Sequence, residues 1–225
     1  MILRRLWLIV LPLATLLAQL RLDVNQMRGD LFAGLAGNKG AFERLLTRTE
    51  EALMQDPDNS QALIWHGAAT LAQSLAQPAE LEVRAPVMER FQKGVSEMDR
   101  AVSLAPKDIE VRVIRGVLMV PVSRNMPPPF SDRMLEKART DFQQVFDLQK
   151  NQLRELGTHP LGELLQALGD IYSRQGNTGE AEKYYTLTQS LLPRTEYSQR
   201  ASTWMKTRQP LPESQTGCIG CHTAK

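Results

Sequence analysis

The segment from Leu165 to Pro193 constrains the fold more than any other part of the chain. Small and apolar residues recur at helical spacing on both sides of Gly176, which indicates two helices joined by a turn. Gly169 and Ala181 have the smallest side chains of this set, so we expect two antiparallel helices to cross there, with tyrosines filling the space around the crossing. Pro193 ends the second helix, because proline lacks the backbone N–H that a helix needs. The set is Leu165, Leu168, Gly169, Tyr172, Ala181 and Tyr185.

This pattern resembles the tetratricopeptide repeat (TPR), with Leu165 in place of the usual tryptophan. The resemblance implies helical hairpins that stack into a solenoid, with the first helix of each hairpin lining a concave groove. Residues 195–207 would form the polar last helix that caps such a stack. A composition rich in Leu, Ala, Gln, Glu and Arg also favours helices. We therefore predict an all-α, TPR-like helical-hairpin solenoid over residues 26–207.

Weaker copies of the unit precede it, at a longer spacing. The helical glycines Gly67, Gly116 and Gly169 are 49 and 53 residues apart, whereas the usual repeat is about 34 residues. We expect the extra residues to form loops between the two helices of a hairpin, over 73–86 and 121–132, because proline disfavours helix there. Both loops would project from one edge of the solenoid, where insertions often carry function. The alternative is that the extra residues only lengthen the helices.

Six apolar side chains are expected to point into the concave groove if the TPR register holds. This lining would suit an apolar peptide of a partner protein, or the haem group considered below. The alternative is a register shifted by one residue, which would make them ordinary core positions. The six residues are Ile64, Ala68, Leu71, Val113, Val117 and Val120.

A second informative motif lies at the C-terminal end, where Cys218, Cys221 and His222 form a CxxCH sequence with the only two cysteines of the chain. Two thiols one short turn apart can reach both vinyl groups of a porphyrin, while the adjacent imidazole lies under the iron. Gly220 leaves room for the macrocycle. Residues 216–223 resemble the haem-binding segment of bacterial c-type cytochromes. The resemblance implies one haem c, with thioether bonds to Cys218 and Cys221 and with His222 as an axial iron ligand.

Other interpretations of this motif stay open. A zinc site needs about four ligands, and beyond the motif the chain offers only two histidines, His66 and His159, so a second chain would have to contribute. A redox dithiol of the thioredoxin type places its CxxC at a helix start beside a strand, a context that is missing here. A simple disulfide or a chance occurrence is the remaining alternative.

The second axial ligand of such a haem is not given by the motif. A cytochrome c domain continues beyond its CxxCH and supplies this ligand from there, whereas only three residues follow His222. We expect the ligand to lie upstream, to come from a partner or to be absent. Met126, before three prolines, resembles the Met loop of cytochromes c, and its thioether would raise the reduction potential. His159 would give bis-histidine ligation, and His66 is expected to pack between helices instead.

The start of the chain predicts export. Arg4 and Arg5 precede an apolar run over residues 6–18, the arrangement of a secretory signal peptide. Residues 1–22 are therefore expected to be a signal peptide or a retained membrane anchor, in which residues 6–22 would lie in the bilayer. The rest of the chain would be periplasmic or on the outer face of the bacterial inner membrane. This location agrees with the motif, since c-type haem is attached on that side.

The sequence thus predicts an exported monohaem c-type cytochrome-like protein. Its TPR domain would dock a redox partner or membrane complex, and residues 208–225, a linker and haem-binding tail loaded by the cytochrome c maturation machinery, would serve electron transfer. The alternatives are a membrane-anchored TPR interaction module or assembly factor without its own haem, and a structural subunit of a membrane redox complex.

Other function classes have little support in the sequence. No catalytic constellation is recognisable, so we do not expect an enzyme, although a peroxidase activity at an open iron position stays possible. The net charge is +2 with both signs intermixed, and no basic run is interleaved with aromatic residues. We therefore expect no nucleic-acid binding.

Overall fold

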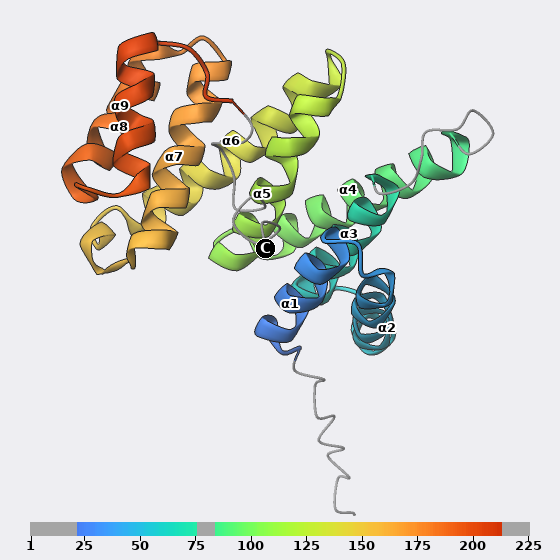
Figure 1. Cartoon of the computed structure of the whole chain (residues 1–225). Coiled ribbons are helices and arrows are strands. Elements are labelled where there is room, and N and C mark those ends of the chain that lie inside the picture. The colour runs from blue at the N-terminus through green and yellow to red at the C-terminus, as the bar shows by residue number, and fades with distance from the viewer. Residues whose placement is uncertain (1–21, 76–83, 213–225) are drawn as a thin grey trace, which may run out of the picture.

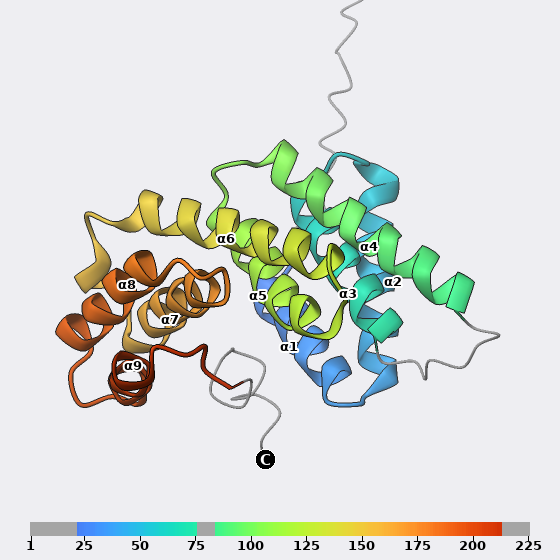
Figure 2. The ribbon, with the colours of Figure 1, turned by 90° about the horizontal axis from the view of Figure 1, so that it is seen from above.

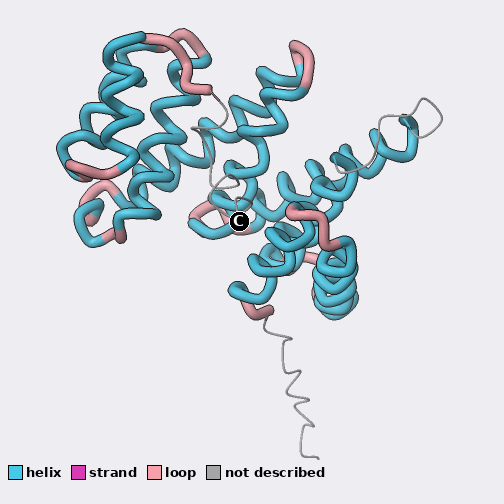
Figure 3. Tube along the Cα trace, viewed as in Figure 1, coloured by secondary structure: helices cyan, strands magenta, loops and turns pink. Residues whose placement is uncertain are grey.

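The computed structural model describes residues 22–75 and 84–212. All regular secondary structure in these two ranges is helical (Figure 1), and Figure 3 shows short loops joining the helices. The predicted all-α class is therefore confirmed for the described part of the chain. The predicted export segment and the CxxCH motif lie outside the described residues.

The helices follow one another with short connections. They are α1 Val24–Leu35, α2 Lys39–Gln55, α3 Ser60–Leu75, α4 Arg84–Leu104, α5 Ile109–Asn125, α6 Phe130–Gln149, α7 Thr158–Arg174, α8 Thr178–Leu191 and α9 Glu196–Thr207, with a 3-10 turn, η2 Leu153–Glu155, before α7.

Several helix ends are set by local side chains. Asp23, Asp108, Asn177 and Thr195 stand immediately before α1, α5, α8 and α9, and each side chain accepts a hydrogen bond from a backbone N–H of the first turn. These bonds satisfy donors that have no partner inside the helix. The connection after α7 turns at Gly176, whose φ of 74° is a left-handed conformation that glycine adopts without strain.

The helices pack mainly as hairpins of consecutive elements. The most extensive contacts join α3 to α4, α5 to α6 and α7 to α8, and α3 also contacts α1, α2 and α5. Figure 2, the view from above, shows α7, α8 and α9 at one end, α1 to α4 at the other and α5 with α6 between them. Helix α3 is thus surrounded by neighbours on several sides, and every residue from Ala62 to Ala72 is buried.

Glycines lie where the paired helices cross. A Cβ atom on Gly169 would lie 2.8 Å from the ring of Tyr185, and one on Gly116 would lie 2.9 Å from the ring of Phe142. Ala181, on α8, is fully buried. The predicted close packing of α7 and α8 at Gly169, with a tyrosine filling the space, is therefore confirmed.

One of the two predicted loop insertions is much shorter than expected, and most of the other, residues 76–83, lies outside the described residues. Helix α5 continues through Pro121 to Asn125 and α6 begins at Phe130, so only residues 126–129 separate them instead of the predicted 121–132. Residues 73–75 likewise belong to α3 and residues 84–86 to α4. Between α5 and α6 the extra length therefore lies mostly in longer helices, which was the alternative interpretation. The expected last helix is present as α9.

Candidate functional site

The three motif residues Cys218, Cys221 and His222 lie outside the described residues, which end at Pro212. After α9 the backbone reverses at Arg208, which has a φ of 56°, and Leu211 is then buried in the core. A guanidinium nitrogen of Arg208 lies 2.7 Å from a carboxylate oxygen of Glu182 on α8. The tail is therefore held against the α7–α9 bundle up to the last described residues.

Helices α7 and α9 run in the same direction, because their starts and their ends are each joined by a hydrogen bond. Near the starts, His159 Nδ1 lies 2.8 Å from the hydroxyl of Tyr197. Near the ends, Trp204 Nε1 donates to the hydroxyl of Ser173 over 2.7 Å. The chain consequently leaves α9 at the Ser173 end of α7, and Figure 1 shows the segment after α9 beside this end.

His159 is an exposed residue in the first turn of α7. The hydroxyl that it contacts, that of Tyr197, also donates to Oε1 of Glu163 over 2.8 Å. The ring of Tyr197 lies directly on α7, since a Cβ atom on Gly162 would be 2.4 Å from it. His159, one of the two predicted upstream ligands, thus contacts a buried tyrosine.

Met126, the other predicted ligand, is the residue that follows α5. Its side chain is half-buried and packs against the hydrophobic core, where the flexible thioether of methionine commonly fills space. This position supports the plainer interpretation, that of a packing residue next to a proline-rich turn.

His66 packs between helices, as expected. It is 4% exposed, its Nδ1 lies 2.7 Å from a carboxylate oxygen of Glu97 on α4, and its Nε2 lies 3.6 Å from one of Glu50 on α2. Both ring nitrogens of this buried histidine therefore face a carboxylate, that of Glu97 mostly buried and that of Glu50 exposed.

The predicted partner groove is corrected on α3. Ile64, Ala68 and Leu71 have no exposed surface, because α1, α2, α4 and α5 all pack against this helix. On α5, Val120 is 9% exposed, while Val113 and Val117 are partly buried at the edge of the core. The α3 positions are core residues, and only Val113 and Val117 keep an appreciable exposed surface.

Sequence reasoning missed a buried cluster of charges between α5 and α6. Asp141 is fully buried and accepts from Arg112 Nη1 over 2.9 Å and from Arg115 Nε over 2.7 Å. Burial by itself would lower the pKa of Arg115, but the hydrogen bonds and charge of Asp141 outweigh it and hold that pKa above its usual range. The signal in the sequence is a pair of arginines three residues apart in an otherwise apolar helix.

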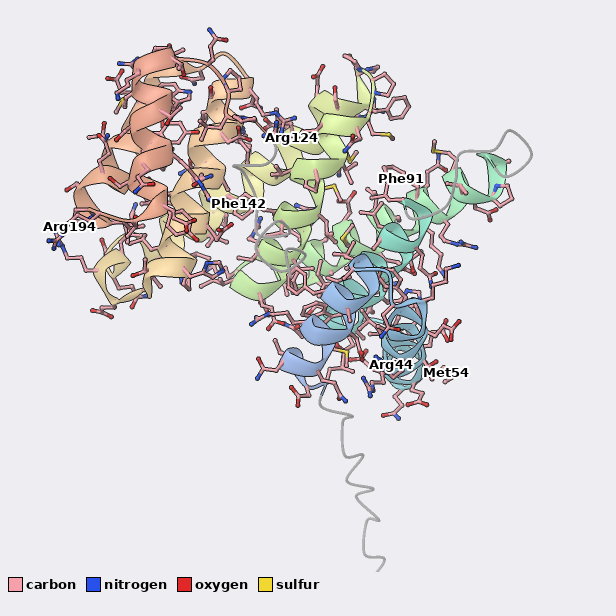
Figure 4. The ribbon with its side chains drawn as sticks, viewed as in Figure 1. Arg44, Met54, Phe91, Arg124, Phe142 and Arg194 are labelled. Carbon is pink, nitrogen blue, oxygen red and sulfur yellow. The ribbon has the colours of Figure 1, made fainter. Side chains whose placement is uncertain are left out.

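A second group of polar side chains connects α5 to α7. Arg124 Nη2 donates to Asp170 Oδ2 over 2.8 Å, and Arg174 Nη2 donates to the hydroxyl of Ser123 over 2.8 Å. Figure 4 shows Arg124 at the upper end of α5, between α5 and α7. Burial raises the pKa of Asp170, and the charges of Arg124 and Arg174 lower it in part. These ion pairs join the α5–α6 hairpin to the α7–α9 bundle.

Residues 22–75 and 84–212 hold no group of three or more His, Cys, Asp or Glu side chains that could bind a metal ion. None of the helices in this part of the chain has the length and apolarity to cross a membrane. The chain matches no known family model, no curated protein and no solved structure.

Proposed function

We propose that this protein is an exported monohaem c-type cytochrome-like protein. The observation that carries the proposal is the CxxCH motif, in which Cys218 and Cys221 would form the thioether bonds and His222 would ligate the iron. When bound, haem c supplies one-electron transfer, and the protein sets its potential through the axial ligands and their surroundings. The basic and apolar residues at the start of the chain support the export that this chemistry requires.

We propose that residues 26–207 form a TPR-like solenoid that carries the haem-binding tail. The consecutive hairpins support this architecture, as do the crossings at Gly116 and Gly169 and the contacts of α3 with both α1 and α5. The junction between α5 and α7 departs from a regular repeat stack, because ion pairs such as Arg124–Asp170 connect these helices. A solenoid of this kind would dock a protein partner, which we propose to be a redox protein or membrane complex at the outer face of the bacterial inner membrane.

The test is production of the full-length chain in an exporting host together with the cytochrome c maturation machinery. The mass of the purified protein should increase by one porphyrin, and the band should stain for haem after denaturing electrophoresis. A matched variant with Cys218→Ser and Cys221→Ser should be exported but colourless. A second control lacking residues 2–22 should stay inside the cell without haem.

A wild-type product without added porphyrin mass would overturn the proposal. Capture of an apocytochrome peptide by this colourless protein would then support the alternative, an interaction module or assembly factor for cytochrome c maturation.

A further inference from the structure

The buried imidazole of His66 lies between two carboxylates that come from different helices. His66 is 4% exposed on α3, and its Nδ1 lies 2.7 Å from Oε2 of Glu97 on α4. The second ring nitrogen, Nε2, lies 3.6 Å from Oε1 of Glu50 on α2. Helices α2 and α4 both pack against α3, so a single ring contacts charged groups of both neighbours.

The contact with Glu97 is held in place by the backbone around it. Gly67, the residue after His66, packs directly against the backbone of Gly94 on α4, which fixes the spacing of the two helices. Glu97 is mostly buried, and Nζ of Lys93 lies 3.8 Å from its other carboxylate oxygen. The carboxylate of Glu97 is therefore a fixed partner of Nδ1.

The number of protons on the ring decides how many of its contacts are hydrogen bonds. An ionised carboxylate only accepts, and a neutral imidazole has a single N–H to donate. The short contact with Glu97 takes that N–H, so the neutral ring presents the lone pair of Nε2 to the carboxylate of Glu50. A second proton, on Nε2, replaces this repulsion by an ion pair. Histidine ordinarily gains its second proton between about pH 8 and about pH 5.

We propose that His66 is a proton-dependent clamp between α2 and α4. With two protons the ring joins Glu50 to Glu97, and with one proton it stays on Glu97 and releases Glu50. The side chain of Glu50 is 61% exposed, so it can leave the ring without any repacking of the core. The clamp does not involve the C-terminal tail, and its test is independent of the proposed function.

The charged side chains of α1 and α5, which also pack on α3, interact with other groups. On α1, Asp30 binds two arginines of α2, and Arg28 interacts electrostatically with Glu110 of α5. Two arginines of α5 bind Asp141 of α6. Within the described residues, the ion pairs of His66 are therefore those with the two glutamates of α2 and α4.

The experiment measures amide hydrogen exchange of α2 by mass spectrometry in the full-length protein. The ion pair with Glu50 is partly exposed, and such pairs contribute modestly. After correction for the intrinsic effect of pH on exchange, the protection of α2 should therefore be about two- to fivefold greater at about pH 5.5 than at about pH 8.

Glu50→Gln is the variant that isolates the clamp. The amide of glutamine can donate to the lone pair of Nε2 when the ring is neutral and accept from Nε2 when the ring is charged, so the protection of α2 should become equal at the two pH values. His66→Gln should also lose the response, because an amide does not titrate. Glu51→Gln, at the adjacent exposed position of α2, is the matched control and should keep the wild-type response.

Three results would overturn the clamp. Equal protection of α2 at the two pH values in the wild type would show that the ring does not hold Glu50 when it is charged. A response that persists in Glu50→Gln would assign it to other titrating groups. Loss of the response in Glu51→Gln would assign it to the overall charge of α2 instead of the contact with His66.

Discussion

Gly67 on α3 and Gly94 on α4 face each other backbone to backbone, so that a Cβ atom on either one would lie 2.7 Å from the carbonyl oxygen of the other. Contact this close allows the two helices to share a seam in which Leu71 and Met98 are fully buried. The α3–α4 hairpin thus depends on the absence of a side chain at two positions that are distant in sequence.

Alanine at either glycine should therefore force the helices apart. We expect Gly67→Ala and Gly94→Ala each to lower the free energy of unfolding by about 1–3 kcal/mol, the usual effect of overpacking a core. Gly29→Ala in α1 is the matched control. No atom lies within 4 Å of a Cβ placed there, so removal of a helical glycine should stabilise the protein by about 0.5–1 kcal/mol. Denaturant titration checks both signs, and equal effects at the three positions would contradict the close crossing.

The buried charge cluster predicts that replacing a buried aspartate lowers stability far more than replacing an exposed one. Asp141→Ala should lower the free energy of unfolding by about 3–5 kcal/mol, because Arg112 would keep its charge in the interior without a counterion and Arg115 would retain only its contact with Asp99. Asp58→Ala removes the partner of Arg100 in an exposed ion pair and should change stability by less than about 1 kcal/mol. Chemical denaturation of both variants is the measurement. A small effect at Asp141 would show that the cluster contributes little.

Two adjacent tyrosines should respond in opposite directions to the same substitution. The buried hydroxyl of Tyr185 has no hydrogen-bond partner in the described part of the chain, whereas that of Tyr184 donates to Gln143 over 2.8 Å. Tyr185→Phe should therefore stabilise the fold by about 1 kcal/mol, and Tyr184→Phe should destabilise it by a similar amount. Thermal unfolding at neutral pH distinguishes the two, and a loss of stability in Tyr185→Phe would contradict the unpaired hydroxyl.

The burial of Tyr185 also predicts that the folded protein loses stability at alkaline pH. Burial raises the pKa of Tyr185 far above its ordinary value, so above about pH 10 the unfolded chain loses a proton that the folded chain keeps. Stability should then fall by about 1.4 kcal/mol per pH unit for this group. Unfolding measured between neutral and strongly alkaline pH should show a shallower decline in Tyr185→Phe, and an unchanged decline would assign the effect to other groups.

The tautomer of His159 can be checked without haem. In the full-length chain with Cys218→Ser and Cys221→Ser, nitrogen NMR should show the proton of His159 on Nδ1, because the single hydrogen of the Tyr197 hydroxyl is donated to Glu163. Both Tyr197→Phe and Gly162→Ala should remove this preference, the first by deleting the acceptor and the second by displacing the ring. His66 serves as the internal control, because its contact with Glu97 is not touched by either change. A proton on Nε2 of His159 in the parent chain would contradict the hydrogen-bonded arrangement.

Local features of the sequence predicted the helices and one of their crossings. The spacing of apolar residues in α7 and α8, together with Gly169 and Ala181, was enough to place that crossing, because periodicity and side-chain size act within one hairpin. The loop predicted over residues 121–132 is confined to residues 126–129 in the structure. Helix α5 continues through Pro121, since tertiary packing can outweigh the local preference of a single residue.

The sequence by itself determined that the described chain is helical and that its helices pair in order along the chain. Only the tertiary structure decided that α3 is enclosed, so that Ile64, Ala68 and Leu71 are core residues, and that Tyr197 and Glu163 orient His159. The physical reason is distance along the chain. The periodicity of apolar residues and the placement of glycines can be recognised in the sequence of one or two neighbouring helices. Burial of a helix on all sides, and a hydrogen bond between α7 and α9, depend instead on which helices pack together in the folded chain.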